Sequence, residues 1–134
     1  MRIDGQCHCG HVRYEAEIDP GRVTVCHCTD CQELSGSPYR VTVITPRENV
    51  RLTAAQPKVY VKIAESGNKR FQHFCPECGS QLFASGEDPQ SDLGIRWGTI
   101  RQRRELQPVR QIWCRSALPW AAEAFTDLPA RETT

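Results

Sequence analysis

The sequence lacks a long apolar run. No stretch of the chain approaches the roughly 20 consecutive apolar residues that a membrane-spanning helix needs, so we expect no contact with a membrane. The first residues, Met1–Cys7, also lack the apolar centre of a secretory signal peptide. These two absences predict a cytoplasmic protein, in a compartment where thiols stay reduced.

An excess of charge of one sign is missing as well. There are 17 Lys and Arg residues against 16 Asp and Glu residues, which leaves a formal charge of +1. Nucleic-acid-binding domains commonly gather a basic excess on one face. The basic run Arg101–Arg104 has no aromatic residues with it to stack bases. We interpret this run as a solvated turn, and the composition argues against nucleic acid as a partner.

Aromatic residues are few, at 7% of the chain, and apolar residues reach only 39%. The hydrophobic core is therefore expected to be modest, and bound metal would add stability that such a core lacks. The length of 134 residues favours a single domain, which we expect to span residues 1–125. The polar segment 126–134 is expected to be a flexible tail. The sequence carries no indication of an oligomeric state.

What the chain does have is the alternation of apolar residues that is typical of β-strands. In residues 11–18, Val12, Tyr14 and Ala16 fall on one face and charged residues fall on the other. One helix is predicted over Thr29–Leu34, because acidic residues occur in its first turn and a Ser-Gly-Ser-Pro run follows it. The fold class is therefore mainly β. Further strands are predicted at Val23–Val25, Tyr39–Ile44, Val50–Thr53, Lys58–Ile63, Phe71–Phe74, Gln81–Ala84, Leu93–Ile100 and Val109–Cys114.

The chain contains eight cysteines, and seven of them fall into three tight clusters. Cysteines separated by one residue are too close to form a relaxed disulfide. Reduced, clustered thiols in a cytoplasmic protein are typical metal ligands. Because two tetrahedral zinc sites need eight ligands, seven thiols predict one filled site and one site with an open position. The clusters are Cys7-His8-Cys9, Cys26-His27-Cys28-Thr29-Asp30-Cys31 and Cys75-Pro76-Glu77-Cys78.

The first and third clusters supply four ligands for a structural zinc: Cys7, Cys9, Cys75 and Cys78. A glycine directly follows each pair and allows backbone amides to turn toward the thiolates. The site would join the N-terminus to the middle of the chain across residues 10–74, which is the work of a structural metal.

Cys26, Cys28 and Cys31 supply three thiols for a second zinc, whose fourth position would be open and whose occupancy would be the more labile. Zinc bound to three thiolates is soft and carries a net negative charge, so a substrate thiol suits it better than an acidified water. The alternative is that a fourth protein ligand closes the site. Cys114 lies in an apolar strand pattern, which favours a buried and inert thiol. The available fourth donors are Cys114, His27, His73 and Asp30.

His27 and Asp30 are also candidates for a catalytic role beside this second site. His27 would hydrogen-bond a substrate or a thiolate, and Asp30, like Glu33, would accept a proton. The alternatives are that His27 points outward and that the carboxylates only place negative charge at the start of a helix.

Taken together, these motifs resemble the glutathione-dependent formaldehyde-activating enzyme family, also called the centromere protein V-like family. The similarity covers roughly residues 3–122, and the order and spacing of the cysteine clusters are its most specific part. The matching segments include Gly5-x-Cys7-His8-Cys9-Gly10, Cys26-His27-Cys28-Thr29-Asp30-Cys31-Gln32, Phe74-Cys75-Pro76-Glu77-Cys78-Gly79 and a closing Ile112-Trp113.

The resemblance implies a small fold of meandering antiparallel sheets pinned by zinc, the β-tent or Mss4-like fold. The family's named reaction joins formaldehyde to glutathione, gives S-hydroxymethylglutathione and is classed with the carbon–sulfur lyases. Its proposed chemistry is attack of a zinc-bound thiolate on an aldehyde carbonyl, so the implied partners are a small-molecule thiol and an aldehyde. The resemblance also implies two ligand sets, a structural one of Cys7, Cys9, Cys75 and Cys78 and a catalytic one of Cys26, Cys28 and Cys31.

The chain departs from the family at Gln111, where a histidine is frequent just before the closing segment. Arg40, Lys69 and Arg70 are candidate partners for substrate carboxylates, with an ordinary surface charge as the alternative for each. Two other functions stay open. One is a non-catalytic zinc scaffold that binds a protein or nucleic acid, and the other is a thiol-redox or zinc-responsive protein that releases the second zinc on mild oxidation.

Overall fold

The computed structural model describes residues 1–122, 128 and 131–133, and most of the expected tail lies outside these residues. Neither helix found there has the length and apolar character that crossing a membrane requires. The helices are α1 (Thr29–Ser35) and α2 (Pro119–Ala122), and 3-10 turns lie at Pro20–Arg22, Arg47–Asn49, Trp97–Thr99, Arg103–Glu105 and Cys114–Ser116. The strands are β1 (Arg2–Gln6), β2 (Arg13–Glu17), β3 (Val23–Cys26), β4 (Arg40–Thr45), β5 (Val50–Leu52), β6 (Lys58–Ile63), β7 (Lys69–Phe74), β8 (Gln81–Gly86), β9 (Leu93–Arg96) and β10 (Arg110–Ile112).

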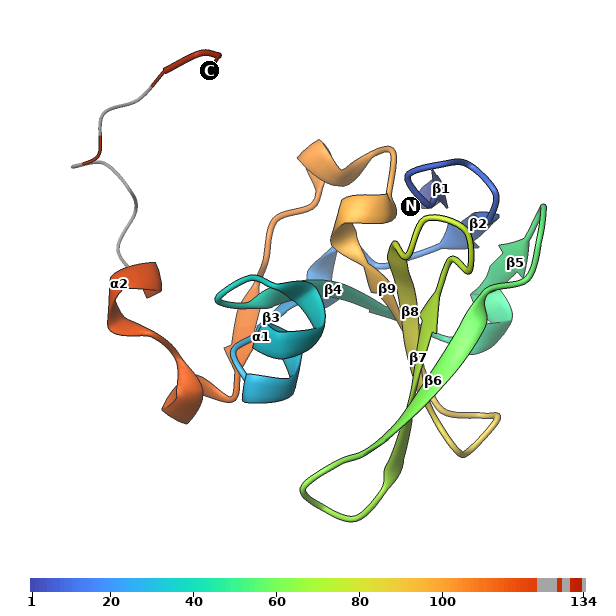
Figure 1. The fold of residues 1–134 in the computed structure, drawn as a ribbon. Coiled ribbons are helices and arrows are strands. Elements are labelled where there is room, and N and C mark those ends of the chain that lie inside the picture. The colour runs from blue at the N-terminus through green and yellow to red at the C-terminus, as the bar shows by residue number, and fades with distance from the viewer. Residues whose placement is uncertain (123–127, 129–130, 134) are drawn as a thin grey trace.

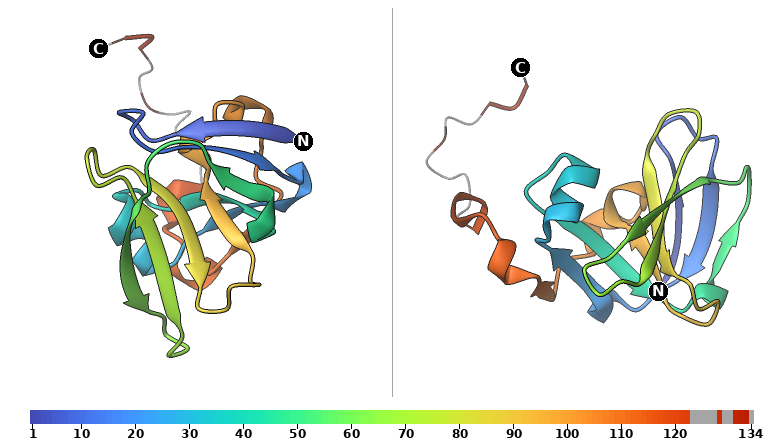
Figure 2. Two further views of the ribbon diagram at one scale, coloured as in Figure 1. Left: turned by 90° about the vertical axis from the view of Figure 1, so that its right-hand side faces the viewer. Right: turned by 60° about the horizontal axis from the view of Figure 1, so that its bottom comes forward.

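The strands form two sheets. The smaller has the order β1-β2-β5, and the larger has the order β10-β3-β4-β9-β8-β7-β6 (Figure 1). The smaller sheet crosses one end of the larger one (Figure 2), and a backbone bridge between Gly5 and Ile100 connects them there. Neighbouring strands are antiparallel, except that β10 runs parallel to β3. The prediction of a mainly β fold is confirmed.

The larger sheet separates a core from a cavity. Val43 in β4 and Ile95 in β9 are fully buried in the hydrophobic core. Because side chains alternate along a strand, their neighbours Thr42, Gly94 and Arg96 lie on the opposite face, where they line a pocket. The helix α1 and the segment after β10 also line this pocket. Alternation along these two strands thus places the hydrophobic core on one side and Thr42 and Arg96 on the side of the pocket.

The alternation predicted from sequence for residues 11–18 is present in β2. Tyr14 and Ala16 are buried, and Arg13 and Glu17 are exposed. The predicted helix is present as α1 and is one residue longer. The sequence pattern does not predict strand β1, because its short RIDGQ sequence contains Asp and Gly, which strands disfavour.

The expectation that Cys114 is buried is wrong, because its side chain is exposed. Strand β10 ends at Ile112, and Trp113 adopts a left-handed conformation with φ of 57°. The chain then enters a 3-10 turn that begins at Cys114. The apolar pattern of this segment therefore marks the end of a strand and not a core strand.

Gly5 in β1 lies against the ring of Tyr14, its cross-strand partner. Tyr14 is 1% exposed, and its Oη lies 2.7 Å from Thr99 Oγ1. An added Cβ at position 5 would meet the Tyr14 Cζ at 2.3 Å and the Thr99 backbone oxygen at 2.5 Å. We expect Gly5→Ala to lower the free energy of unfolding by about 1–3 kcal/mol in denaturant titrations.

The matched control is Gly98→Ala, because nothing lies within 4 Å of a Cβ added there. That change should alter the free energy of unfolding by less than about 0.5 kcal/mol. Equal effects of the two substitutions would contradict the steric argument for Gly5.

Candidate metal centres and their pocket

Two clusters of thiols form in the folded chain. The first joins Cys7 and Cys9, which follow β1, to Cys75 and Cys78, which follow β7. Their Sγ atoms all lie within 4.8 Å of one another, and Cys9 Sγ is 3.6 Å from Cys7 Sγ and 3.8 Å from Cys75 Sγ. Tetrahedral zinc with Zn–S bonds of about 2.3 Å needs sulfur separations of about 3.8 Å. The donor set and its spacing therefore fit zinc.

Local backbone geometry shapes this four-cysteine site. The glycines after each pair, Gly10 and Gly79, have φ of 79° and 76°, in the region that glycine adopts most readily. The Gly10 N–H donates to the Cys7 carbonyl at 3.1 Å, and the Gly79 N–H donates to the Cys75 carbonyl at 2.9 Å. The backbone N–H of Val12 donates to Cys7 Sγ at 3.3 Å. Each turn therefore presents two sulfurs together with N–H donors that favour the thiolate form.

Four thiols so close together cannot all ionise without a cation. Hydrogen bonds from Ser80 lower the pKa of Cys78 to about 5. A hydrogen bond from the His11 backbone favours the Cys9 thiolate, but desolvation and the neighbouring thiols raise the pKa of Cys9 to about 12. A divalent cation would remove this conflict, because it stabilises every thiolate that it binds.

The second cluster contains Cys26, Cys28 and Cys31, whose Sγ atoms also lie within 4.8 Å of one another. Cys26 ends β3, Cys28 is the N-cap of α1, and Cys31 lies in the first turn of that helix. The Cys28 Sγ accepts the backbone N–H of Cys31 at 3.2 Å. A hydrogen bond with Cys26 and then the charge of Arg40 lower the pKa of Cys31 to about 5. The strand-to-helix turn thus gathers three thiols at one corner.

No fourth protein donor joins this three-cysteine site among residues that the structure describes. The four candidates from sequence have other contacts or other positions. Asp30 forms an ion pair with Lys62 at 2.6 Å, and His73 Nε2 lies 3.0 Å from Ser85 Oγ. Burial and the charges of Arg47 and Arg96 lower the pKa of His73. Cys114 is exposed and does not line the pocket.

His27, the fourth candidate, is 5% exposed and packs edge-on against the ring of Tyr39. Its Nε2 lies 2.9 Å from Oε1 of Gln111, and its backbone N–H donates to the Ile112 carbonyl at 3.1 Å. The alternative in which His27 points outward is therefore wrong. His27 therefore connects the turn that carries Cys28 to strand β10, through the side chain of Gln111 and the backbone of Ile112.

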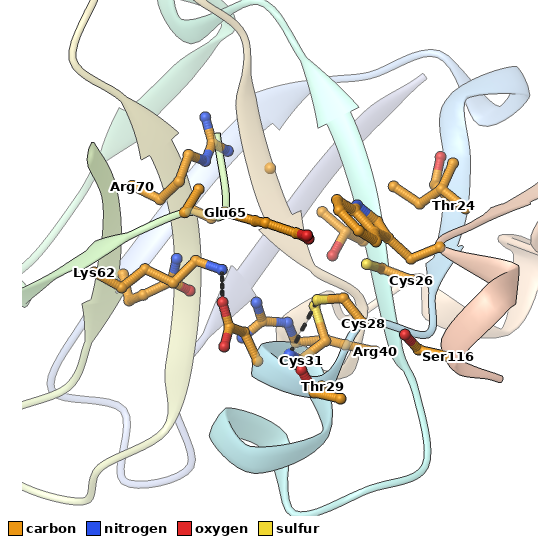
Figure 3. Close-up of a pocket in the computed structure, with 18 of the residues that line it drawn as sticks. Thr24, Cys26, Cys28, Thr29, Cys31, Arg40, Lys62, Glu65, Arg70 and Ser116 are labelled. Carbon is orange, nitrogen blue, oxygen red and sulfur yellow. Dashed lines mark hydrogen bonds and ion pairs between the residues drawn. The ribbon is translucent and has the colours of Figure 1, made fainter. Parts of the chain in front are cut away.

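The three-cysteine site opens into a pocket of about 660 Å³. Figure 3 shows Cys26, Cys28 and Cys31 at one side of this pocket, with Lys62, Glu65 and Arg70 across from them. The floor is the face of the larger sheet opposite the core, and the walls are α1, the β6–β7 hairpin and the segment after β10. The residues of the sheet that line it are Thr24, Cys26, Arg40, Thr42, Ile44, Lys62, Ile63, Arg70, Gln72, Ala84, Gly94, Arg96 and Ile112.

Two ion pairs lie at the pocket walls. Lys62 Nζ is 2.6 Å from Asp30 Oδ2, which joins the β6 strand to α1. Arg115 Nη2 is 2.8 Å from Glu65 Oε2, and its guanidinium also stacks over the Trp113 ring at 4.8 Å. These contacts bring the segment after β10 and the β6–β7 hairpin together across the pocket.

Arg40 and Arg70, two of the three basic candidates from sequence, line the pocket. The third, Lys69, is exposed and lies 4.0 Å from Glu87, away from the lining residues. Arg96 also lines the pocket, but the sequence does not predict this, because nothing in the local pattern distinguishes it from a surface arginine. Burial and the charge of Arg40 lower the pKa of Arg96 to about 9, so it stays charged at neutral pH.

Comparisons with known proteins identify one family. The sequence model described as "Glutathione-dependent formaldehyde-activating enzyme" matches residues 2–116. Proteins of Colletotrichum graminicola and Penicillium rubens, each named "Putative glutathione-dependent formaldehyde-activating enzyme", are 29% identical over 93 residues and 31% identical over 92 residues. Each match covers 67% of this chain and 47% of the relative, so the chain spans about half the length of these relatives.

The fold also has a solved counterpart. A crystal structure of a Rhodobacter sphaeroides protein matches with a TM-score of 0.62 and 18% sequence identity. The match covers 81% of this chain and 98% of that one. At this identity the comparison shows a shared fold.

Proposed function

Because the chain belongs to the glutathione-dependent formaldehyde-activating enzyme family, we propose that it is a zinc-dependent carbon–sulfur lyase that acts on a thiol–aldehyde adduct. The expected adduct is one such as S-hydroxymethylglutathione, formed from glutathione and formaldehyde. One observation carries the proposal: three thiols lie at the wall of a 660 Å³ pocket with no fourth protein donor among the described residues. Three protein ligands and an adjoining cavity are the usual arrangement at a catalytic zinc.

The two cysteine sets would then have different roles within one domain of residues 1–125. Cys7, Cys9, Cys75 and Cys78 would fill every position of a structural zinc. Cys26, Cys28 and Cys31 would hold the second zinc, which supplies a soft Lewis acid that favours a sulfur ligand. This gives two zinc ions per chain.

The reaction needs a proton to move but no oxidant or reductant. In the direction of synthesis, a bond forms between the thiol sulfur and the aldehyde carbon. The carbonyl π-electrons pass to oxygen, and the proton lost by the thiol ends on that oxygen. We assign the proton acceptor to Asp30, which lines the pocket beside the thiols. Lys62, 2.6 Å from Asp30, would donate a hydrogen bond to the developing oxygen anion.

His27 would act as a positioning residue. Its contacts with Gln111 and with the Ile112 carbonyl hold the turn between Cys26 and Cys28 against β10. A fixed turn keeps the three sulfurs close together and holds them in a constant position relative to the pocket.

The proposal predicts two zinc ions per chain and one freely reactive thiol, Cys114, which is exposed and outside both clusters. Metal analysis and a thiol titration on the folded protein would check both counts. Exchange NMR would then measure the rate at which glutathione and formaldehyde interconvert with their adduct. We expect the loaded protein to raise this rate above that of the spontaneous reaction.

Two outcomes would contradict the proposal. A fully loaded protein that leaves the spontaneous rate unchanged would favour a non-catalytic zinc scaffold. Release of about one zinc on mild oxidation, with its return on reduction, would favour a thiol-redox protein instead. The Cys114→Ser variant is the matched control, since it should keep both zinc ions and the wild-type rate.

A further inference from the structure

Three arginines meet on the pocket face of the larger sheet. Arg40 begins β4, Arg96 ends β9, and Arg70 lies in β7. All three line the pocket that contains the three-cysteine site, and Figure 3 labels Arg40 and Arg70. Arg40 is 8% exposed and Arg96 is 7% exposed, so water reaches little of either side chain. These residues are called the arginine cluster below.

The arginine cluster has neutral partners. Arg40 Nη1 donates to Gln81 Oε1 at 2.7 Å. Arg96 donates to Thr42 Oγ1 at 2.7 Å and to Gln72 Oε1 at 2.9 Å. The Nε atoms of Arg40 and Arg96 are buried and have no hydrogen-bond partner. Within the described part of the chain, no ion pair includes a member of the cluster.

This arrangement is costly unless an anion completes it. A buried guanidinium is ordinarily paired, because the energy of desolvating its charge must be offset by an opposite charge. The two carboxylates that line the pocket, Asp30 and Glu65, are already paired with Lys62 and Arg115. Three thiolates around a divalent metal leave one net negative charge. Two positive charges of the cluster therefore remain without a counter-ion.

The pocket also leaves room for a ligand at this place. Gly94 and Ala84 are paired on β9 and β8 and form the floor between Arg96 and Arg70. Gly94 has no side chain and Ala84 has only a methyl group, so neither reaches far into the pocket, although Thr42 Cγ2 lies close above Gly94. Gln72, opposite Ala84 on β7, fixes one nitrogen of Arg96 and leaves the Nε edge unused.

We propose that the arginine cluster is a carboxylate-binding subsite, which selects thiols and thiol adducts that carry a carboxylate over neutral ones. The planar fork of an arginine matches the two oxygens of a carboxylate and holds them in a fixed orientation. The thiol half of this selection rests on the proposed function, whereas binding of the carboxylate does not. A substrate held at both ends would present its sulfur to the three-cysteine site in one orientation.

Three small probes test carboxylate binding and thiol binding separately. The probe 3-mercaptopropionate has a thiol and a carboxylate, 2-mercaptoethanol has only the thiol, and 3-(methylthio)propionate has only the carboxylate together with a blocked sulfur. NMR of the arginine Nε–H groups in the zinc-loaded protein reports the subsite. We expect both carboxylate probes to shift the Arg40 and Arg96 signals saturably and 2-mercaptoethanol to leave them unchanged.

Affinity for the three-cysteine site is measured separately in cobalt-loaded protein, from the absorption of a thiolate bound to cobalt. We expect 3-mercaptopropionate to bind about tenfold more tightly than 2-mercaptoethanol, the effect of one charge-assisted hydrogen-bonded pair. Arg70→Gln, at a half-buried position, and Arg96→Gln should remove most of this preference while binding 2-mercaptoethanol as wild type does. Lys69→Gln removes the adjacent but exposed positive charge and should keep the full preference.

The outcomes distinguish failure of this subsite from failure of the proposed function. Equal affinity for the two thiols together with arginine signals that do not respond to 3-(methylthio)propionate would overturn the subsite. Arginine signals that respond while no thiol changes the cobalt spectrum would support the subsite and contradict the proposed function. If Arg96→Gln does not fold, Arg70→Gln and the wild-type titrations still decide the matter.

Discussion

Replacing Cys78 by alanine is expected to unfold the protein. The four-cysteine site joins the turn after β1 to the turn after β7, and the buried core around it is modest. A structural zinc supplies about 10–16 kcal/mol of apparent binding free energy in small zinc peptides. The whole stability of a domain is about 5–15 kcal/mol. Loss of one ligand therefore removes a large share of the free energy of unfolding.

Circular dichroism with metal analysis would measure this effect. We expect Cys78→Ala, and equally Cys9→Ala, to lose the cooperative thermal transition of the wild type. A strong chelator should do the same to the wild-type protein. Cys114→Ala is the matched control, because its thiol is exposed and outside both clusters, and its free energy of unfolding should change by less than about 0.5 kcal/mol. A Cys78→Ala variant with the wild-type transition would rule out a structural metal at this site.

Replacing Cys28 by alanine is expected to remove one metal and the activity while the protein stays folded. The three-cysteine site holds together only a strand end and the first turn of α1, which are close in sequence. Loss of its metal therefore breaks no connection between distant parts of the chain. The rate of adduct formation should fall by on the order of 100-fold or more, toward the spontaneous rate, since even residues that only support metal ligands have effects of this size.

A second variant separates the metal from the helix cap. Cys28 Sγ also accepts the Cys31 N–H as the N-cap of α1. Loss of this cap in Cys28→Ala should cost about 1 kcal/mol, whereas serine in Cys28→Ser can keep a cap hydrogen bond. Both variants should contain one zinc per chain and lack the activity. Unfolding of both, to the degree expected for Cys78→Ala, would contradict the division into a structural and an open site.

The limits of sequence reasoning follow from the range of the interactions involved. Alternation within a strand is local, so Tyr14 and Ala16 could be placed on the buried face of β2 in advance. Strand β1 forms because β2 pairs with it, and its own residues do not reveal it. Cys114 is exposed because it follows β10, an edge strand whose three residues are all exposed, and an apolar pattern does not reveal this position.

The two groups of cysteines that could each hold a metal ion could be predicted from the sequence alone. Thiol identity and short spacing decide which cysteines can share a metal, because a tight turn brings neighbouring sulfurs together whatever surrounds them. The two groups formed in the structure are the groups that the spacing predicted. The mainly β class could be determined in the same way, since it rests on the period of two within each strand.

Only the tertiary structure decided what stands opposite the three-cysteine site. Arg40, Arg70 and Arg96 come from three strands, and the order β4-β9-β8-β7 brings them to one face of one pocket. Strand order depends on contacts between distant parts of the chain, such as the pairing of β4 with β9, which no local pattern encodes. The same contacts bury Arg40 and Arg96 without a carboxylate partner among the described residues, and burial turns two ordinary charges into candidates for binding an anion.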